Sequence, residues 1–236
     1  MTDNSNRALF DFVESKKHIK VNKSDDCFWS AEFRKDCALI RYSDKGNRYA
    51  AFAHELLHIK VQLDGLRKVV CGIAIDNKIL SNGYLVTVID ALDNELQHHK
   101  FFKDFLNMGY SADDFFNDDD FEKGFNTFLV QNEHFLEEIL VQYVALLLPV
   151  GKAPQLKEKF ESKFSNHLVK FGKIDQIFSA WRDNNANDYQ KCIVDFFRIF
   201  DSGQVWLGYS KSIEDFPEKG FFTSSSFALP LGDPSS

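Results

Sequence analysis

The pentapeptide His54-Glu55-Leu56-Leu57-His58 constrains this chain more than any other stretch of its sequence. It lies in the stretch from Ala53 to Ile59, whose apolar residues have the spacing of a helix. Two histidines four apart share one helix face, so both imidazoles can reach a single tetrahedral ion. Glu55 stands beside them, where a carboxylate can handle a proton on metal-bound water. The pentapeptide therefore predicts a metal site carried by a helix.

The residues around this motif predict an ordered set of elements. A strand is expected over residues 36–42, followed by a turn over 43–47 that can also cap the next helix. The motif helix should run from about Arg48 to Leu63 and stop at Gly65, which suits a left-handed C-terminal cap. A short helix through Lys17 and an extended segment over 18–21 precede the strand.

The rest of the chain reads as mainly helical. Residues 67–75 are ambiguous between strand and helix, and the spacing over 84–108 predicts a second long helix. Further helices are predicted over 121–131, 133–148, 153–170, 174–183 and 188–201, and the tail from Ser202 reads as irregular. We therefore predict a mainly α, α+β fold. Residues 1–118 would form a metal-binding core with a small sheet before the motif helix, and residues 119–236 a helical lobe continuous with it.

Composition narrows the function classes. The 236 residues are 44% hydrophobic and include 25 phenylalanines, enough for one substantial core. A net charge of −7 with no long basic run argues against nucleic-acid binding. The four cysteines contain no Cys-x-x-Cys pair, and no apolar run is long enough to span a bilayer. With no apolar signal core at the N-terminus, we expect a cytoplasmic protein without membrane contact.

A catalytic zinc site needs three protein ligands, so the motif requires a third. The segment from Asp93 to His99 offers Glu95 and His98, which lie three apart and face one way on the second long helix. One of them could bind the metal while the other makes a hydrogen bond behind it. We favour His98, because the apolar stripe of Val86, Ile89 and Leu96 leaves it pointing inward.

These residues resemble the His-Glu-x-x-His zinc metallopeptidases, the zincins. The match is close over residues 51–59, where the motif is surrounded by uncharged side chains, and Lys60 departs from the pattern. Asn94-Glu95 is similar to the pair on the third-ligand helix of many gluzincins. A looser resemblance links residues 137–149 to regulatory zincins of the IrrE and ImmA kind, and it implies Glu138 as the third ligand.

The resemblance implies a zincin-like core, one zinc ion and a peptide or protein substrate. Glu55 would be the general base that takes a proton from the activated water and later passes it to the leaving amine. Tyr84, Tyr110 and His99 are candidates for stabilising the oxyanion. The strand over 36–42 could pair with an extended substrate.

Two other classes stay open. Glu55-x-x-His58 and Glu95-x-x-His98 are two Glu-x-x-His units, as in ferritin-like di-iron bundles, but no glutamate lies between the units as that pattern requires. A non-catalytic regulatory protein stabilised by its metal is the other alternative. The sequence leaves the oligomeric state undetermined.

Overall fold

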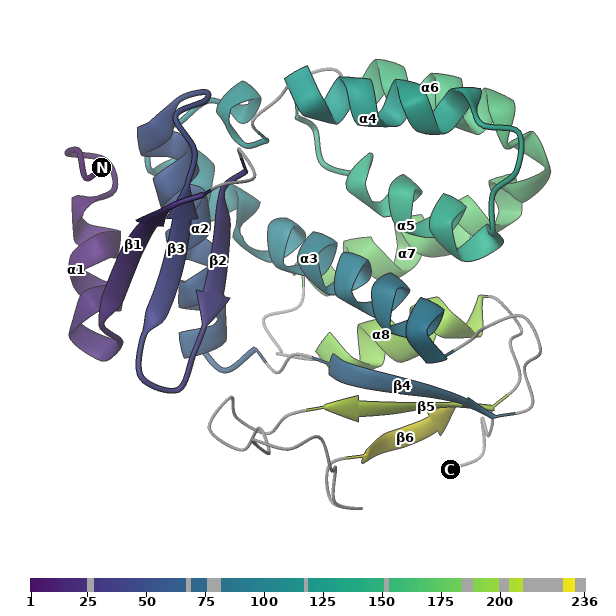
Figure 1. Cartoon of the computed structure of the whole chain (residues 1–236). Helices are drawn as coiled ribbons and strands as arrows, with labels where there is room; N and C mark the ends of the chain where they lie inside the picture. Colours follow the sequence, from purple (N-terminus) through teal and green to yellow (C-terminus); the bar gives the residue numbers. More distant parts are fainter. Residues whose placement is uncertain are drawn as a thin grey trace. The chain divides into compact units, whose positions relative to one another are not determined.

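Helices make up most of the described chain, and two small sheets accompany them (Figure 1). The computed structural model describes residues 1–24, 28–66, 69–75, 82–116, 119–150, 153–183, 189–199, 204–209 and 227–231. They form two compact units, one of residues 1–65, 97–131 and 148–159, the other of residues 66–96, 132–147 and 160–236. In the described residues, no helix combines the length and the apolar character needed to cross a membrane.

The first unit carries the predicted motif helix and the strands before it. Its elements are α1 (Arg7–Lys16), β1 (Ile19–Lys23), β2 (Ser30–Phe33), β3 (Ala38–Tyr42), α2 (Arg48–Leu63), the C-terminal part of α3 (Asn82–Asn107), the 3₁₀ turn η1 (Ala112–Asp114) and α4 (Asp119–Val130). The predicted strand over 36–42 is confirmed as β3, and the predicted motif helix is confirmed as α2.

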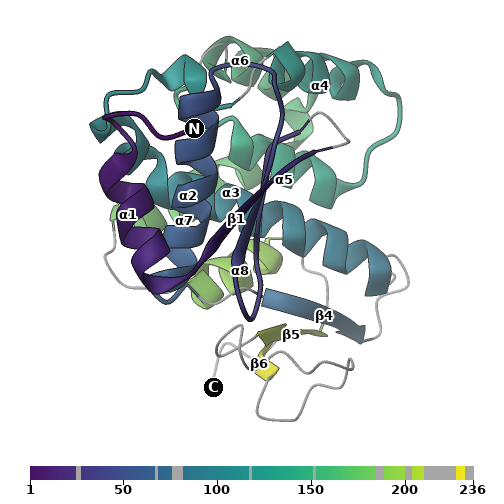
Figure 2. The same cartoon turned by 60° about the vertical axis from the view of Figure 1, so that its left-hand side comes forward.

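The sheet of this unit has the order β1-β3-β2, with β1 parallel and β2 antiparallel to β3. Ala38, Leu39 and Ile40 of the central strand are buried. Figures 1 and 2 show α1 and α2 on one face of the sheet, where α2 contacts β2 and β3. Because β3 has a neighbour on each side, our prediction that it pairs with an extended substrate is wrong. Within the described sheet, β2 is an outer strand.

Local interactions define both ends of α2. The side chain of Asn47 accepts hydrogen bonds from the backbone N–H groups of Tyr49 and Ala50 at 3.2 and 3.4 Å, which caps the first turn. Gly65 follows the helix with φ of +95°, a conformation that a side chain disfavours. Every residue from Ala50 to Ile59 is buried, so this helix carries its histidines and its glutamate into the interior.

The second unit combines helices with a sheet that the sequence did not predict. Its elements include β4 (Val69–Ile75), α5 (Leu136–Ala145), η2 (Ser165–His167), α7 (Leu168–Asp183), α8 (Tyr189–Arg198), β5 (Gln204–Tyr209) and β6 (Phe227–Leu231), while α6 (Ala153–Lys163) and α3 contribute to both units. The helix predicted over 153–170 is interrupted at η2.

The prediction of an irregular tail from Ser202 is wrong for residues 204–209 and 227–231, which form strands, and the rest of that tail lies outside the described residues. β5 pairs antiparallel with β4, with Ile75 opposite Gln204, and β6 pairs antiparallel with β5. The same pairing identifies residues 69–75 of the ambiguous segment as a strand, and residues 67 and 68 lie outside the described part of the chain. Which distant segment a strand pairs with depends on tertiary context, which a local sequence pattern does not specify.

Candidate metal centre

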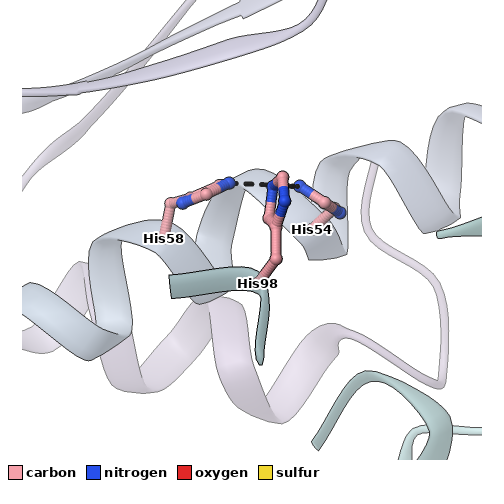
Figure 3. A group of neighbouring side chains, drawn as sticks. All are labelled: His54, His58 and His98. Carbon is pink, nitrogen blue, oxygen red and sulfur yellow. Dashed lines mark hydrogen bonds between the residues drawn. The ribbon is translucent and has the colours of Figure 1, made fainter. Parts of the chain in front are cut away.

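Three buried imidazoles meet in the first unit. The Nε2 atom of His54 lies 3.1 Å from Nε2 of His58 and 3.2 Å from Nε2 of His98. One nitrogen from each ring lies within 4.8 Å of the others, and Figure 3 shows the three rings turned toward a common point. The side chains are 8%, 9% and 4% exposed, in the order of the chain. This group is close enough to hold a metal ion.

The arrangement of the three Nε2 atoms suits coordination of one cation better than hydrogen bonding between the rings. Tetrahedral coordination with zinc–nitrogen bonds of about 2.0–2.1 Å separates neighbouring ligand nitrogens by about 3.3 Å. The two measured distances approach that value. His54 Nε2 faces two nitrogens at once, yet an imidazole nitrogen carries one proton or one lone pair in the ring plane. A proton can therefore satisfy only one of the two contacts, whereas a central cation accepts all three lone pairs.

The third member of the group comes from α3. His54 and His58 lie one turn apart on α2, and His98 reaches them from the part of α3 that belongs to the same unit. Glu95, which we named beside His98, is not in the group found among the described residues. Its carboxylate is half-buried and accepts a hydrogen bond from Asn94 Nδ2 at 3.4 Å.

Glu138 is also outside this group. It lies in the first turn of α5, where its carboxylate accepts a hydrogen bond from the backbone N–H of Phe135 at 3.2 Å. A carboxylate in the first turn satisfies a helix N–H and interacts favourably with the helix dipole. In the described structure, Glu138 therefore acts as a helix cap.

Burial keeps the imidazoles of His54 and His58 neutral, which is the form that binds metals. It lowers the pKa of His54 well below the usual value, and the neighbouring rings of His98 and His58 add to the effect. The backbone of Phe115 acts in the opposite direction and raises the pKa of His54. Its geometry is not that of a hydrogen bond, because His54 Nδ1 is buried without a hydrogen-bond partner. Burial and His98 lower the pKa of His58 to about 3.

Phenylalanine rings surround the three imidazoles and shield them from water. Phe101 stands edge-on to all three imidazoles, with ring centroids 4.8 Å from His58, 5.2 Å from His54 and 5.7 Å from His98. Phe115 lies 4.7 Å from His54 and 5.5 Å from His98. Surrounding rings exclude water from the imidazoles and lower the local dielectric, so charge placed at this point is weakly screened.

Glu55 is also buried, with 7% of its surface exposed. Burial raises the pKa of its carboxyl to about 8, and a hydrogen bond from the backbone N–H of Ala31 on β2 opposes that rise. At 100° per residue, Glu55 lies 60° around α2 from His58 and 100° from His54. The motif glutamate is thus anchored between its helix and an outer strand of the sheet.

The three oxyanion candidates have different surroundings. Tyr110 donates its hydroxyl hydrogen to Asp3 at 3.0 Å, and its ring packs against Phe105. His99 is buried on α3. Tyr84 lies in the first turns of α3, and its side chain is outside the described part of the structure.

Sequence reasoning missed two residues that touch this site. Gln97 is buried beside His98, and its Oε1 lies 3.0 Å from His58 Nδ1. Ala31 belongs to β2, a strand that we did not predict. The sequence did contain a signal for Gln97, because it is a polar residue next to the candidate ligand His98. The contact of Ala31 with Glu55 had no such signal, because it depends on how α2 packs against the sheet.

Comparison of the chain with protein-family models, with curated proteins and with solved structures found no match.

Proposed function

We propose that this protein is a zinc-dependent metallopeptidase with a single metal ion. The observation that carries the proposal is the convergence of three Nε2 atoms from His54, His58 and His98, with Glu55 on the same helix as two of them. Three protein ligands leave one coordination position open, which is the arrangement of catalytic rather than structural zinc sites.

Neutral nitrogen ligands favour zinc over magnesium or calcium, which prefer oxygen. A zinc ion bound here would act as a Lewis acid toward a carbonyl group and would lower the pKa of water in its open position. The lowered pKa values of His54 and His58 support this choice, because no proton has to be displaced from these two rings before the metal binds.

Glu55 would carry protons during the reaction. A group with a pKa near the working pH can both accept and release a proton, and burial brings the pKa of Glu55 to about 8. Its carboxylate would take a proton from the attacking water and pass it to the leaving amine. The N–H of Ala31 steadies the ionised form of Glu55 and limits the directions in which the carboxylate can point.

The sheet suggests how a peptide could be held. β2 is an outer strand, and it supplies the N–H that binds Glu55. An extended peptide added along an outer strand gains main-chain hydrogen bonds without dependence on its sequence. We therefore propose β2, in place of the central strand β3, as the strand that would align a peptide or protein substrate.

The di-iron alternative has less support. Ferritin-like sites use glutamates together with histidines, whereas the group found among the described residues consists of histidines alone. A non-catalytic protein stabilised by its metal shares every ligand with the proposed enzyme, so only a measurement of turnover separates these two.

The test combines metal analysis with a hydrolysis assay. The purified protein should contain one zinc per chain and should cleave peptides in a mixed peptide library, with products detected by mass spectrometry. A chelator should stop cleavage. Glu55→Gln should retain the zinc and lose cleavage, while Glu158→Gln, an exposed change of the same kind, should retain both. Two irons per chain would refute the zinc site, and bound zinc without cleavage of any peptide would favour the non-catalytic role.

A further inference from the structure

We infer that Gln97 is a positioning residue that holds His58 in the tautomer able to bind a metal. The inference rests on the proposed metal centre and assigns a role to a residue outside the His-Glu-x-x-His motif. Gln97 is 4% exposed, and its Oε1 lies 3.0 Å from Nδ1 of His58. A buried amide that meets a buried imidazole over this distance has little competition from water.

The direction of this hydrogen bond decides which ring nitrogen is available. An amide oxygen only accepts, so His58 must carry its proton on Nδ1 to make the bond. The lone pair is then on Nε2, the nitrogen that lies 3.1 Å from His54 Nε2 at the centre of the group. A donor in place of this oxygen would favour the opposite tautomer, in which a proton occupies the position that a metal needs.

In the metal-free protein, the ring proton of His58 could be donated to His54 in place of Gln97. If His58 were protonated on Nε2, it could donate to His54 Nε2 at 3.1 Å and remain satisfied. That tautomer opposes metal binding. The oxygen of Gln97 therefore biases a choice between two hydrogen bonds, one that leaves the metal position free and one that fills it.

The position of Gln97 explains how this bias is maintained. Gln97 immediately precedes His98 on α3, so one turn of a single helix supplies both the third imidazole and the acceptor for the second. Movement of this turn would shift the two together. Hydrogen-bond partners of this kind fix the orientation of a ligand ring and raise its basicity, and their loss typically weakens metal binding 10- to 100-fold.

The experiment uses two substitutions at this position and one matched control, with Zn²⁺ alone as the probe. Gln97→Leu removes the acceptor and keeps a side chain of similar size. Gln97→Glu offers only acceptor oxygens while its carboxyl is ionised. Asn94→Leu changes an exposed amide one turn before His98. Zinc affinity is measured by competition with a chromogenic chelator. The His58 tautomer is read from ¹⁵N NMR of the protein in EDTA, and thermal unfolding in EDTA reports the stability of the metal-free fold.

Gln97→Leu should bind zinc about 10- to 100-fold more weakly and should move the His58 proton from Nδ1 to Nε2. Thermal unfolding in EDTA should show a cooperative transition, so that weaker zinc binding is not the result of an unfolded chain. Gln97→Glu should bind zinc at least as tightly as the wild type with the proton on Nδ1, and Asn94→Leu should change neither property.

Wild-type affinity in Gln97→Leu, or weaker binding in Gln97→Glu at a pH that ionises its carboxyl, would overturn the inference. If Gln97→Leu does not fold, the affinity and tautomer of Gln97→Glu decide between the same outcomes. A wild-type protein that binds no zinc would refute the proposed function instead, and the position of the His58 proton would still show whether Gln97 controls the tautomer.

Discussion

Replacement of Glu55 by Gln should stabilise the metal-free protein, by an amount that depends on pH. Gln has almost the same shape as Glu, and its carbonyl oxygen can still accept the hydrogen bond from the Ala31 N–H. The difference between the two side chains is the cost of ionising a carboxyl in the interior. Burial raises the pKa of Glu55 from 4.5 to about 8. The folded state therefore holds this proton over a pH range in which the unfolded chain has released it.

The sign follows from linkage between proton binding and folding. A carboxyl whose folded pKa is raised stabilises the fold below its unfolded pKa, and that stabilisation is lost as pH rises toward the folded pKa. The unfolding free energy of Glu55→Gln minus that of the wild type should grow by about 1.4 kcal/mol per pH unit between pH 4.5 and pH 8. The difference should reach about 3 kcal/mol at pH 7 and level off above pH 8.

Urea unfolding in EDTA, followed by circular dichroism at several pH values, measures this difference directly. The other titrating groups are common to both proteins, so their contributions cancel in the subtraction. Glu158→Gln, an exposed change on α6, shows what the loss of one carboxylate does without burial. A difference between Glu55→Gln and the wild type that stays constant from pH 5 to pH 8 would show that the Glu55 carboxyl is not held in a dry interior.

Three further outcomes are expected. His98→Ala should lose stoichiometric zinc, whereas Glu95→Ala and Glu138→Ala should retain it. The reason is that, of these three residues, only His98 belongs to the group with His54 and His58. Metal content measured by mass spectrometry tests this. Asn47→Ala should lower the unfolding free energy by about 1 kcal/mol in urea, since it removes the acceptor that caps α2, and an unchanged stability would refute the cap. Gly65→Ala should destabilise by about 1 kcal/mol, because φ is +95° there; a Tm equal to the wild type would contradict this.

The elements around the motif were the most predictable part of the fold. Their signals act over a few residues: the acceptor of Asn47, the spacing of the α2 side chains and the left-handed conformation of Gly65. The second sheet lacked such signals. β4 and β5 are more than 120 residues apart, and each becomes a strand through hydrogen bonds to the other, which no local pattern encodes.

For the candidate site too, one part was predictable from the sequence and another depended on tertiary packing. The sequence by itself determined that His54 and His58 share a helix face, because four residues make about one turn of any α-helix. It also favoured His98 as the third ligand and left Glu95 and Glu138 as alternatives. Tertiary structure brought His98, and neither glutamate, into the group with His54 and His58, since which α3 residue meets α2 depends on the rotation and crossing of two packed helices. Packing of α3 against α2 placed the oxygen of Gln97 on His58, and packing of the sheet against α2 placed the N–H of Ala31 on Glu55.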